Sequence, residues 1–430
     1  MNERDGSLLP TVAGSGGLME LLVVPPLTDF TTEVVAPAGA VVLDLNEHLV
    51  ERVADPSRLR AAAELPPAGP LPALAGRAAA AILERKAFDD AHLRAAGTAL
   101  RLAEDPAVRL TIDGLELAEG STQSSRDVAG AAGRCELFRP EVELAREVAG
   151  GRRAFVVVDA DQQLPAAFAL VRALGAELVT LCGRLVRRHA AALRRVPELA
   201  GVRWRDWSPE RVIRGLWYVR DTDPVERVRW VTGTRLPPPS GPWAGWLDAA
   251  RVAAFPAEAL ARCRGLTIIV TRIDFLAAVT GLNGLTVDLR RLLAAIPSGV
   301  PVTSELVVGA PGMAAGVVQE SVELLADGAG GVRLAGLRPY RMGIRSRWAG
   351  PSLRFPPDAG NDLVRWIEFD APETMRAYEV TRMIREWRER LPWLPPGRLA
   401  ACSVAGDMPA PVWDPCAEVV CLVRWAAGSR

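Results

Sequence analysis

Three cysteines near the C-terminus are the residues of this chain whose type and spacing most clearly suggest a chemical role. Cys402, Cys416 and Cys421 lie in one short, proline-broken segment of the 430-residue sequence. Because thiolates bind zinc and iron–sulfur clusters, the sequence predicts a metal site here, with Cys263, Asp414 or an external group as the fourth ligand. Buried free thiols are the alternative, because no Cys-x-x-Cys pair occurs and cysteine is a common small core residue.

Glycine, alanine and proline residues follow an apolar run in the later half of the chain. Residues 300–313 read VPVTSELVVGAPGM, which predicts a buried strand that opens into a turn at Gly309, Ala310, Pro311 and Gly312. The residues after this turn have a helical pattern of apolar positions. The sequence therefore predicts a strand, a turn and a helix in succession.

A second strand is predicted over Val332–Leu337, and Arg338 and Arg341 follow it. Ligands of α/β proteins bind at the carboxyl ends of the strands, and a guanidinium group can make a bidentate contact to a carboxylate or phosphate. We therefore expect the turn and these arginines to bind a ligand. Lys86 is the only lysine, so the many arginines reflect a coding bias, and a solvated basic face is the alternative.

Polar residues also follow two predicted strands of the N-terminal half. The strands span 154–158 and 177–181, and the candidate cofactor-binding residues after them are Asp159, Gln162, Cys182 and Gly183. Two earlier strands, Leu21–Val24 and Ala40–Leu45, complete a pattern that predicts a doubly wound, Rossmann-like parallel sheet. So few residues separate the earlier two strands that we expect the helix between them to be short or absent.

Charge and hydropathy exclude several classes of function. The 51 basic residues balance the 51 acidic residues, so there is no electrostatic case for nucleic acid or an anionic membrane as a partner. No run of 18 apolar residues occurs, and the start of the chain lacks a signal-peptide pattern, so we expect a cytoplasmic protein. The histidines, His48, His92 and His189, are expected to be ordinary surface or packed residues.

The segments ELVVGAPGM and LRPYR resemble the later half of a radical S-adenosylmethionine (SAM) barrel. In that family such a turn and such an arginine-bearing strand end help to hold the nucleoside ligand. The resemblance implies SAM as a cofactor, with the residues of the turn, Arg338 and Arg341 around it.

The N-terminal half resembles the cobalamin-binding domain of cobalamin-dependent radical SAM proteins. The matching passages are LLVVPPLTDF, VVLDLNEHLVERV and FVVVDADQQLPAAFALVRALGAELVTLCGRLV. The resemblance implies cobalamin at the strand ends that carry Asp159, Gln162, Cys182 and Gly183. No histidine lies in an Asp-x-His-x-x-Gly setting, so a histidine ligand to cobalt is not supported.

The motif that defines radical SAM chemistry is missing. Members of the family bind a 4Fe–4S cluster through Cys-x-x-x-Cys-x-x-Cys after the first barrel strand. Where that loop is expected, this chain has only Cys263, and too few residues follow it for the first half of a barrel. We therefore expect a truncated partial barrel, or alternatively a divergent one that begins near residues 227–232.

These patterns predict an α/β protein in four parts. We expect a cobalamin-binding-like domain over residues 1–200, a Trp- and Pro-rich linker over 201–262, a radical-SAM-like partial barrel over 263–395 and a cysteine-containing tail over 396–430. All twelve tryptophans lie beyond residue 201, which supports a boundary there.

Two functions follow from the resemblance. The first is a protein that has lost radical chemistry and acts as a binding or scaffolding partner in peptide or natural-product modification. Its expected partner is a peptide substrate or an intact radical SAM enzyme. The alternative is a cofactor-retaining enzyme that uses cobalamin, SAM or a metal for methyl transfer or redox tailoring of a peptide.

Overall fold

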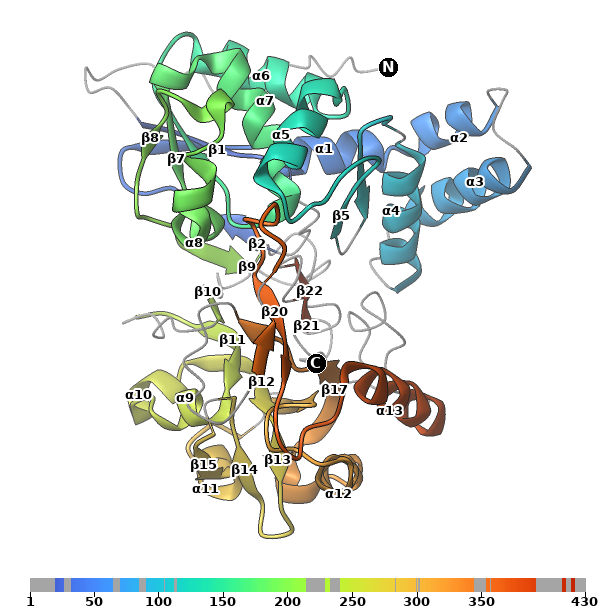
Figure 1. Cartoon of the computed structure of the whole chain (residues 1–430), viewed down its shortest axis with the longest axis vertical. Coiled ribbons are helices and arrows are strands. Elements are labelled where there is room, and N and C mark those ends of the chain that lie inside the picture. The colour runs from blue at the N-terminus through green and yellow to red at the C-terminus, as the bar shows by residue number, and fades with distance from the viewer. Residues whose placement is uncertain are drawn as a thin grey trace, which may run out of the picture.

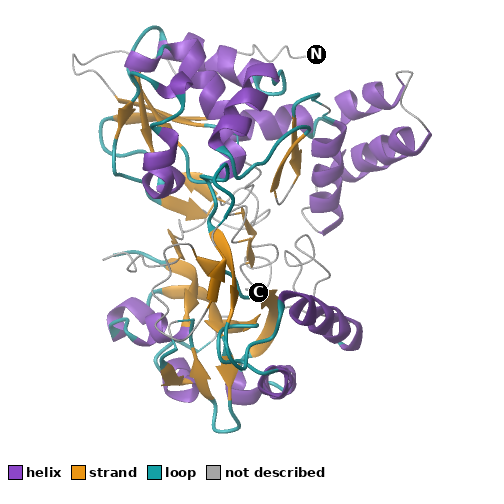
Figure 2. Ribbon diagram, viewed as in Figure 1, coloured by secondary structure: helices purple, strands orange, loops and turns teal. Residues whose placement is uncertain are grey.

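The computed structural model has two α/β units that lie one above the other in Figures 1 and 2. It describes residues 20–26, 32–64, 70–84, 90–103, 105–111, 114–213, 229–232, 240–282, 284–298, 300, 302–343, 353–355, 357–391, 412–414 and 419–421. No helix among these residues is long and apolar enough to cross a membrane.

The first unit is built on a five-stranded parallel sheet with the strand order β3-β1-β6-β7-β8. Its strands are β1 (Glu20–Val24), β3 (Ala40–Asp44), β6 (Ala154–Val157), β7 (Val179–Cys182) and β8 (Arg203–Trp204). Valine and leucine supply at least half of the residues of β1, β3, β6 and β7, and the central strands β1, β6 and β7 are largely buried. The order of the strands reverses between β1 and β6, which makes this the switch point of the sheet.

Helices cover one face of this sheet. Residues of α1, α5, α6, α7 and α8 form one core with Leu21, Val23, Val156 and Leu181. The helices span α1 (Leu45–Val53), α5 (Ser125–Arg134), α6 (Arg139–Ala149), α7 (Leu164–Leu174) and α8 (Arg184–Leu193), with short 3₁₀ turns η1 (Asp161–Gln163), η2 (Ala176–Leu178) and η3 (Pro197–Leu199) between them. The Ser124 hydroxyl caps α5 by accepting the Asp127 N–H, and α6 ends at Gly150 in the left-handed region.

The second face of the sheet has a different cover. Its core residues, among them Leu22, Val24 and Cys182, contact Val34 of strand β2 (Thr32–Val34) and the half-buried Trp207, and include no residue of a described helix. The described part of the connection from β1 to β3 holds β2 and no helix, which agrees with the expectation of a short or absent helix. The helix layer that a doubly wound sheet would have on this face is not present among the described residues.

A helical extension projects from the side of the first unit (Figure 1). It consists of α2 (Pro56–Glu64), α3 (Pro70–Glu84) and α4 (Asp90–Leu102), followed by the hairpin of β4 (Val108–Thr111) and β5 (Gly114–Leu117). Alanine-rich sequence favours these helices, and the Asp55 carboxylate accepts the Ser57 and Arg58 N–H groups at the start of α2.

The second unit contains a seven-stranded sheet with the order β17-β16-β12-β11-β10-β9-β2. Five strands follow one another in sequence and run parallel: β10 (Arg229–Thr232), β11 (Trp243–Asp248), β12 (Cys263–Val270), β16 (Val302–Val308) and β17 (Arg333–Pro339). The antiparallel strand β9 (Arg211–Ile213) then joins them to β2. Because β2 lies between β1 and β3 in the chain, this strand ties the two units together.

The connections of the second sheet pack on the face that carries Leu247, Ile268 and Leu306. They comprise α9 (Ala249–Ala253), α10 (Ala257–Leu260), the ribbon β13 (Arg272–Ile273), β14 (Ala278–Thr280) and β15 (Thr286–Asp288), α11 (Leu289–Ala294), α12 (Ala315–Ala326) and η5 (Ala329–Gly331). The ribbon and α11 together lie in the connection from β12 to β16.

The remaining elements are β18 (Met342–Gly343), β19 (Leu353–Phe355), β20 (Trp366–Asp370), α13 (Ala377–Arg390), β21 (Val412–Asp414) and β22 (Val419–Cys421). The loop before β20 binds the first unit. Asp362 accepts hydrogen bonds from the Ser125 N–H and hydroxyl, both at 2.8 Å, and Leu363 packs into the core of the first sheet.

Most strand predictions are confirmed within two residues: those for β1, β3, β6, β7, β16 and β17. The range 201–262, interpreted from sequence as a linker, contributes β9, β10 and β11 to the second sheet. The run of parallel strands therefore begins at Arg229. This is the region, residues 227–232, where the alternative prediction placed the first strand. The described sheet has β17 and β2 at its edges, so it shows an open parallel run and no closed barrel.

Candidate functional site

The switch point of the first sheet is where a doubly wound fold would place a ligand, and a side chain spans it. Gln163 is fully buried, and its amide nitrogen donates to the Pro25 carbonyl at 2.9 Å. Its amide oxygen accepts the Asp159 N–H at 2.7 Å and the Ala160 N–H at 3.2 Å. Gln163 thus joins the ends of β1 and β6. The neighbouring Gln162, which was predicted to bind a cofactor, is also fully buried.

Asp159 lies at the carboxyl end of β6 and holds the start of α8. Its carboxylate accepts the Arg184 N–H at 2.7 Å and the Ser208 hydroxyl at 3.3 Å, and the Arg184 Nε lies 3.6 Å away. The side chain is 1% exposed. A carboxylate at a helix N-terminus is stabilised by the N–H groups and dipole of that helix. Asp159 therefore has a complete structural role in capping α8.

Gly183 brings two backbones together at the same edge. It has φ = +109°, and its N–H donates to the Trp207 carbonyl at 2.7 Å. A Cβ at this position would lie 2.7 Å from the carbonyl carbon of Val158 and closer still to its oxygen. The requirement for glycine here comes from this close approach of β6, β7 and the segment at Trp207.

Cys182 is enclosed in the sheet. Its thiol is fully buried and donates weakly to the Val156 carbonyl at 3.7 Å. Burial raises the pKa of the Cys182 thiol to about 12, and the nearby Asp159 carboxylate adds to the shift. Since the thiolate is the form that attacks electrophiles and binds metals, the neutral Cys182 thiol acts as a core residue.

These residues do not fit a corrin ring at the carboxyl edge of the first sheet. Gln163 fills the switch point, and the segment that contains Trp207 and Ser208 hydrogen-bonds directly to Gly183 and Asp159. Arg365 immediately precedes β20 of the second unit. Its guanidinium nitrogen lies 3.8 Å from the Asp161 carboxylate, and the Arg365 side chain is 6% exposed. The chain itself thus contacts the groups that the resemblance assigns to cobalamin.

The turn after β16 is closed in a similar way. Gly309 has φ = +82°, and a Cβ on it would lie 2.5 Å from Cγ2 of Val380 on α13. The Gly312 N–H donates to the Thr374 hydroxyl at 2.8 Å, and Ala310 and Pro311 are buried. The segment from Thr374 into α13 therefore packs against the turn and takes up one of its donors.

Substitutions in this turn separate backbone conformation from packing. We expect Gly309→Ala to cost about 2–3 kcal/mol of unfolding free energy, because it adds a clash with Val380 to the strain of a positive φ. Gly312→Ala, at φ = +78° with open space around the Cβ, should cost about 1 kcal/mol. Urea denaturation measures the cost of each substitution in the unmodified chain, and the cost of Gly309→Ala in a chain that already carries Val380→Ala. If Gly309→Ala cost the same in both chains, Val380 would not be the side chain that limits the space at Gly309.

Arg338 lies on the second sheet between an acid and an aromatic ring. Its guanidinium nitrogen is 3.4 Å from Glu305, and its Cζ lies 4.3 Å from the centre of the Trp246 ring. The Trp246 indole N–H donates to the same Glu305 carboxylate at 2.7 Å. This group joins β11, β16 and β17 through an ion pair and a cation–π contact. Arg341, by contrast, is exposed.

A carboxylate that sequence patterns did not single out ends β11. Asp248 caps α9 by accepting the Ala250 N–H at 3.0 Å, and it also accepts the Leu282 N–H. The pKa of the Asp248 carboxyl is raised, because burial disfavours the charged form and these hydrogen bonds offset only part of that effect. Its two contacts hold the loop after β14 against the start of α9.

The SAM positions implied by the resemblance are thus engaged within the chain. The Gly312 N–H is bound to Thr374, Val380 abuts Gly309, and Arg338 is paired with Glu305. A SAM carboxylate would have to displace Glu305 from Arg338, and the nucleoside would have to displace α13. The described residues therefore do not fit SAM in the arrangement that they adopt.

The cysteines are separated from one another where they are described. Cys263 is fully buried at the beginning of β12, where its thiol donates to the Gly265 carbonyl at 3.5 Å, so it lies at the amino end of its strand and not on a cluster loop. Cys402 and Cys416 lie outside the described residues, and Cys421 ends β22 opposite Val412. Among the described residues, no group of three or more His, Cys, Asp or Glu side chains is placed to hold a metal ion.

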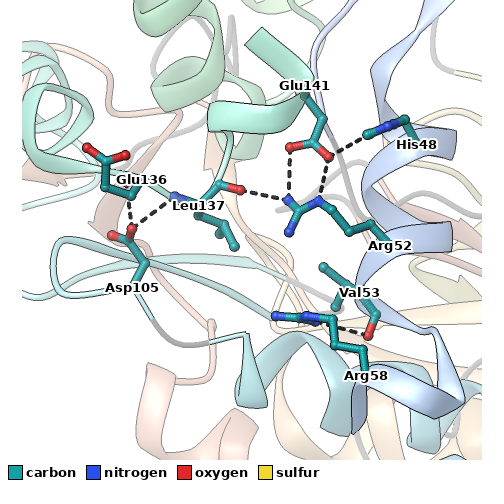
Figure 3. Close-up of polar contacts among 8 residues, drawn as sticks. All are labelled: His48, Arg52, Val53, Arg58, Asp105, Glu136, Leu137 and Glu141. Carbon is teal, nitrogen blue, oxygen red and sulfur yellow. Dashed lines mark hydrogen bonds and ion pairs between the residues drawn. The ribbon is translucent and has the colours of Figure 1, made fainter. Parts of the chain in front are cut away.

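A polar cluster joins α1 to α6 (Figure 3). Glu141 is fully buried, and its carboxylate accepts two hydrogen bonds from Arg52, both at 2.9 Å, while His48 Nδ1 lies 2.8 Å away. Arg52 also donates to the Leu137 carbonyl at 2.7 Å. A sequence signal exists, because Glu141 occupies the same helical face as the buried Ala145 and Ala149.

A second arginine, Arg58, lies beside this cluster. The pKa of Arg58 is lowered by burial and by the neighbouring charge of Arg52, while Asp55 and Glu141 act in the opposite direction. Glu141 therefore offsets the charge of more than one guanidinium group. The cluster joins α1 to α6 close to the start of α2, and the Glu141 carboxylate is fully engaged in that contact.

Comparison of the chain with protein-family models, with curated proteins and with solved structures gave no match.

Proposed function

We propose that this protein is a radical-SAM-like protein that has lost 4Fe–4S and SAM radical chemistry and acts as a binding or scaffolding partner in the modification of a peptide or other natural product. The partner is a peptide substrate or an intact radical SAM enzyme. The sequence resemblance motivates the proposal, and the run of five parallel strands in the second unit supports it.

The turn after β16 is the observation that carries the proposal. In the resemblance this turn serves the nucleoside, whereas here the Thr374 hydroxyl accepts its Gly312 N–H and Val380 packs on Gly309. Arg338, the implied carboxylate ligand, is bound by Glu305 and stacked on Trp246. The residues that the resemblance assigns to SAM thus make contacts within the chain. We therefore expect such a protein to bind its partner through its surface.

Anaerobic reconstitution with iron and sulfide tests the loss of chemistry. We expect no 4Fe–4S absorbance and no reductive cleavage of SAM to 5′-deoxyadenosine, because the sequence has no Cys-x-x-x-Cys-x-x-Cys motif. Calorimetric titration with SAM should give no binding heat, since Arg338 is already paired. An authentic radical SAM enzyme, reconstituted in parallel, shows that the procedure works.

Either a cluster that cleaves SAM or saturable SAM binding would overturn the proposal. The purified protein should also be assayed for iron, zinc and corrin. A metal that is retained by the full chain and lost when Cys402, Cys416 and Cys421 are replaced by serine would support the alternative, a cofactor-retaining enzyme.

A further inference from the structure

Helix α3 has two apolar faces and uses only one of them. The face that packs between α2 and α4 consists of Ala73, Gly76, Ala79, Ala80 and Leu83, all buried. About half a turn away, at 3.6 residues per turn, lies a second row that is exposed to solvent: Leu71, Leu74, Ala78 and Ala81. We call this row the α3 seam.

The exposure of the α3 seam is unusual for a monomer. Leu71 is 77% exposed and Leu74 is 63% exposed, although both occupy regular positions on a helix. Only Arg77 and Glu84 carry a charge among the fifteen residues of α3. A helix that is apolar around most of its circumference is typical of one that is buried on both sides. Figure 1 shows α3 at the outer side of the extension, away from both sheets.

The spacing of the seam is that of a helix pair. Its residues recur three and four positions apart, as the a and d positions of a heptad do. In an antiparallel pair each a position faces a d position, so Leu71 would face Ala81 of a second copy, and Leu74 would face Ala78. Every layer then places one leucine against one alanine, and large-against-small contacts let two helices approach closely.

A parallel pair would not have this property. It would place Leu71 against Leu71 and Ala81 against Ala81, which leaves one end crowded and the other loosely packed. Glu84 does not choose between the two directions, because its carboxylate is paired with Arg60 of α2 in the same chain. The sequence of the seam is therefore complementary to itself about a two-fold axis near residue 76.

We propose that the α3 seam is the contact between two copies of this chain, which associate as an antiparallel, two-fold symmetric pair. One helix of this length buries less than the ~800 Å² per partner of a standard interface, so the dimer is weak and forms reversibly at high concentration. The two Arg77 side chains flank the seam close to the axis and repel each other. Added salt therefore strengthens this dimer.

Disulfide trapping tests the register. Chains carrying Leu71→Cys are mixed with chains carrying Ala81→Cys under mild oxidation, and we expect a covalent heterodimer because these two positions share a layer. Leu71→Cys alone should give none above the background of the unmodified chain, because its own two copies would be about 15 Å apart along the axis. Trapping of Leu71→Cys with itself, or equal trapping of both samples, would overturn the antiparallel pair.

Sedimentation equilibrium over a range of concentrations tests the association. The unmodified chain should show a dimer that strengthens with salt, and the double variant Leu71→Gln and Leu74→Gln should stay monomeric at the same helix content by circular dichroism. Leu285→Gln is a matched control, because it removes an exposed leucine (60%) outside the seam and should leave the dimer unchanged. A chain that remains monomeric throughout, or a dimer that survives the double variant, would rule out the seam.

Discussion

Replacing Glu141 by alanine is expected to lower the free energy of unfolding of the first unit by about 3 kcal/mol, because removal of one partner from a buried ion pair leaves the other uncompensated. The carboxylate is fully buried and accepts two hydrogen bonds from Arg52. Without it, Arg52 and the partly buried Arg58 would retain their positive charges at the joint of α1 and α2. Their mutual repulsion would act mainly on the helical extension.

A nearby carboxylate on the same helix provides the control. Glu143 lies 3.1 Å from Arg139, one helical turn away, and both side chains are more than half exposed. Exposed pairs of this kind contribute little, so Glu143→Ala should change the free energy of unfolding by about 0.5 kcal/mol or less. The Glu141→Gln variant keeps the shape and one acceptor, and we expect an intermediate loss.

Urea denaturation followed by circular dichroism at neutral pH measures these three variants. Hydrogen exchange of the α1 and α2 amides adds a local readout, since loss of the cluster should release these helices before the sheet unfolds. Equal midpoints for Glu141→Ala and Glu143→Ala would show that the buried cluster contributes no more than a surface pair.

Six strands of the two sheets were predictable because each is a short run of apolar, often β-branched residues between polar or glycine-rich turns. β6 and β16 are examples, and their predicted bounds differ from the observed ones by two residues at most. Such runs bury both faces and leave little ambiguity of type. Which strands pair with one another could not be predicted in the same way, because pairing depends on partners far away in the chain.

The interpretation of residues 201–262 as a linker shows this limit. Prolines and tryptophans there indicated a wrapping segment, yet Trp243 is fully buried, packs edge-on against Phe255 and donates its indole N–H to the Ala259 carbonyl. A strand with a tryptophan in the core looks like an anchored loop when composition is the only guide. Its place between β10 and β12 follows from backbone pairing, which no local pattern records.

The strand ends that carry the candidate residues were predictable from the sequence, but the contacts that these residues make were not. Sequence patterns located the polar strand ends correctly, and Asp159 and Gly183 do lie together. What the patterns could not show is that Ser208, Thr374 and Val380 come from later segments and occupy these groups. A glycine that serves a ligand and a glycine that serves a close backbone approach have the same local sequence.

Gly183→Ala distinguishes these two roles and should destabilise the protein more than Glu141→Ala does. The positive φ alone costs about 1–2 kcal/mol for alanine. The new Cβ would also meet the carbonyl carbon and nitrogen of Val158 at 2.7 and 2.8 Å, and backbone atoms cannot rotate away as a side chain can. Separation of β6 from α8 would further strain the bond from the Arg184 N–H to Asp159. We expect a total loss of about 4 kcal/mol or more.

Gly201→Ala isolates the backbone contribution, because Gly201 has φ = +88° but its Cβ would meet only the Ala176 Cβ at 3.7 Å. This variant should lose about 1 kcal/mol in the same urea denaturation. If Gly183 served a cofactor instead, its alanine variant would fold with a loss close to that of Gly201→Ala. A difference of several kcal/mol between the two would assign Gly183 to the packing of its own chain, and with it the edge of the sheet where cobalamin was expected.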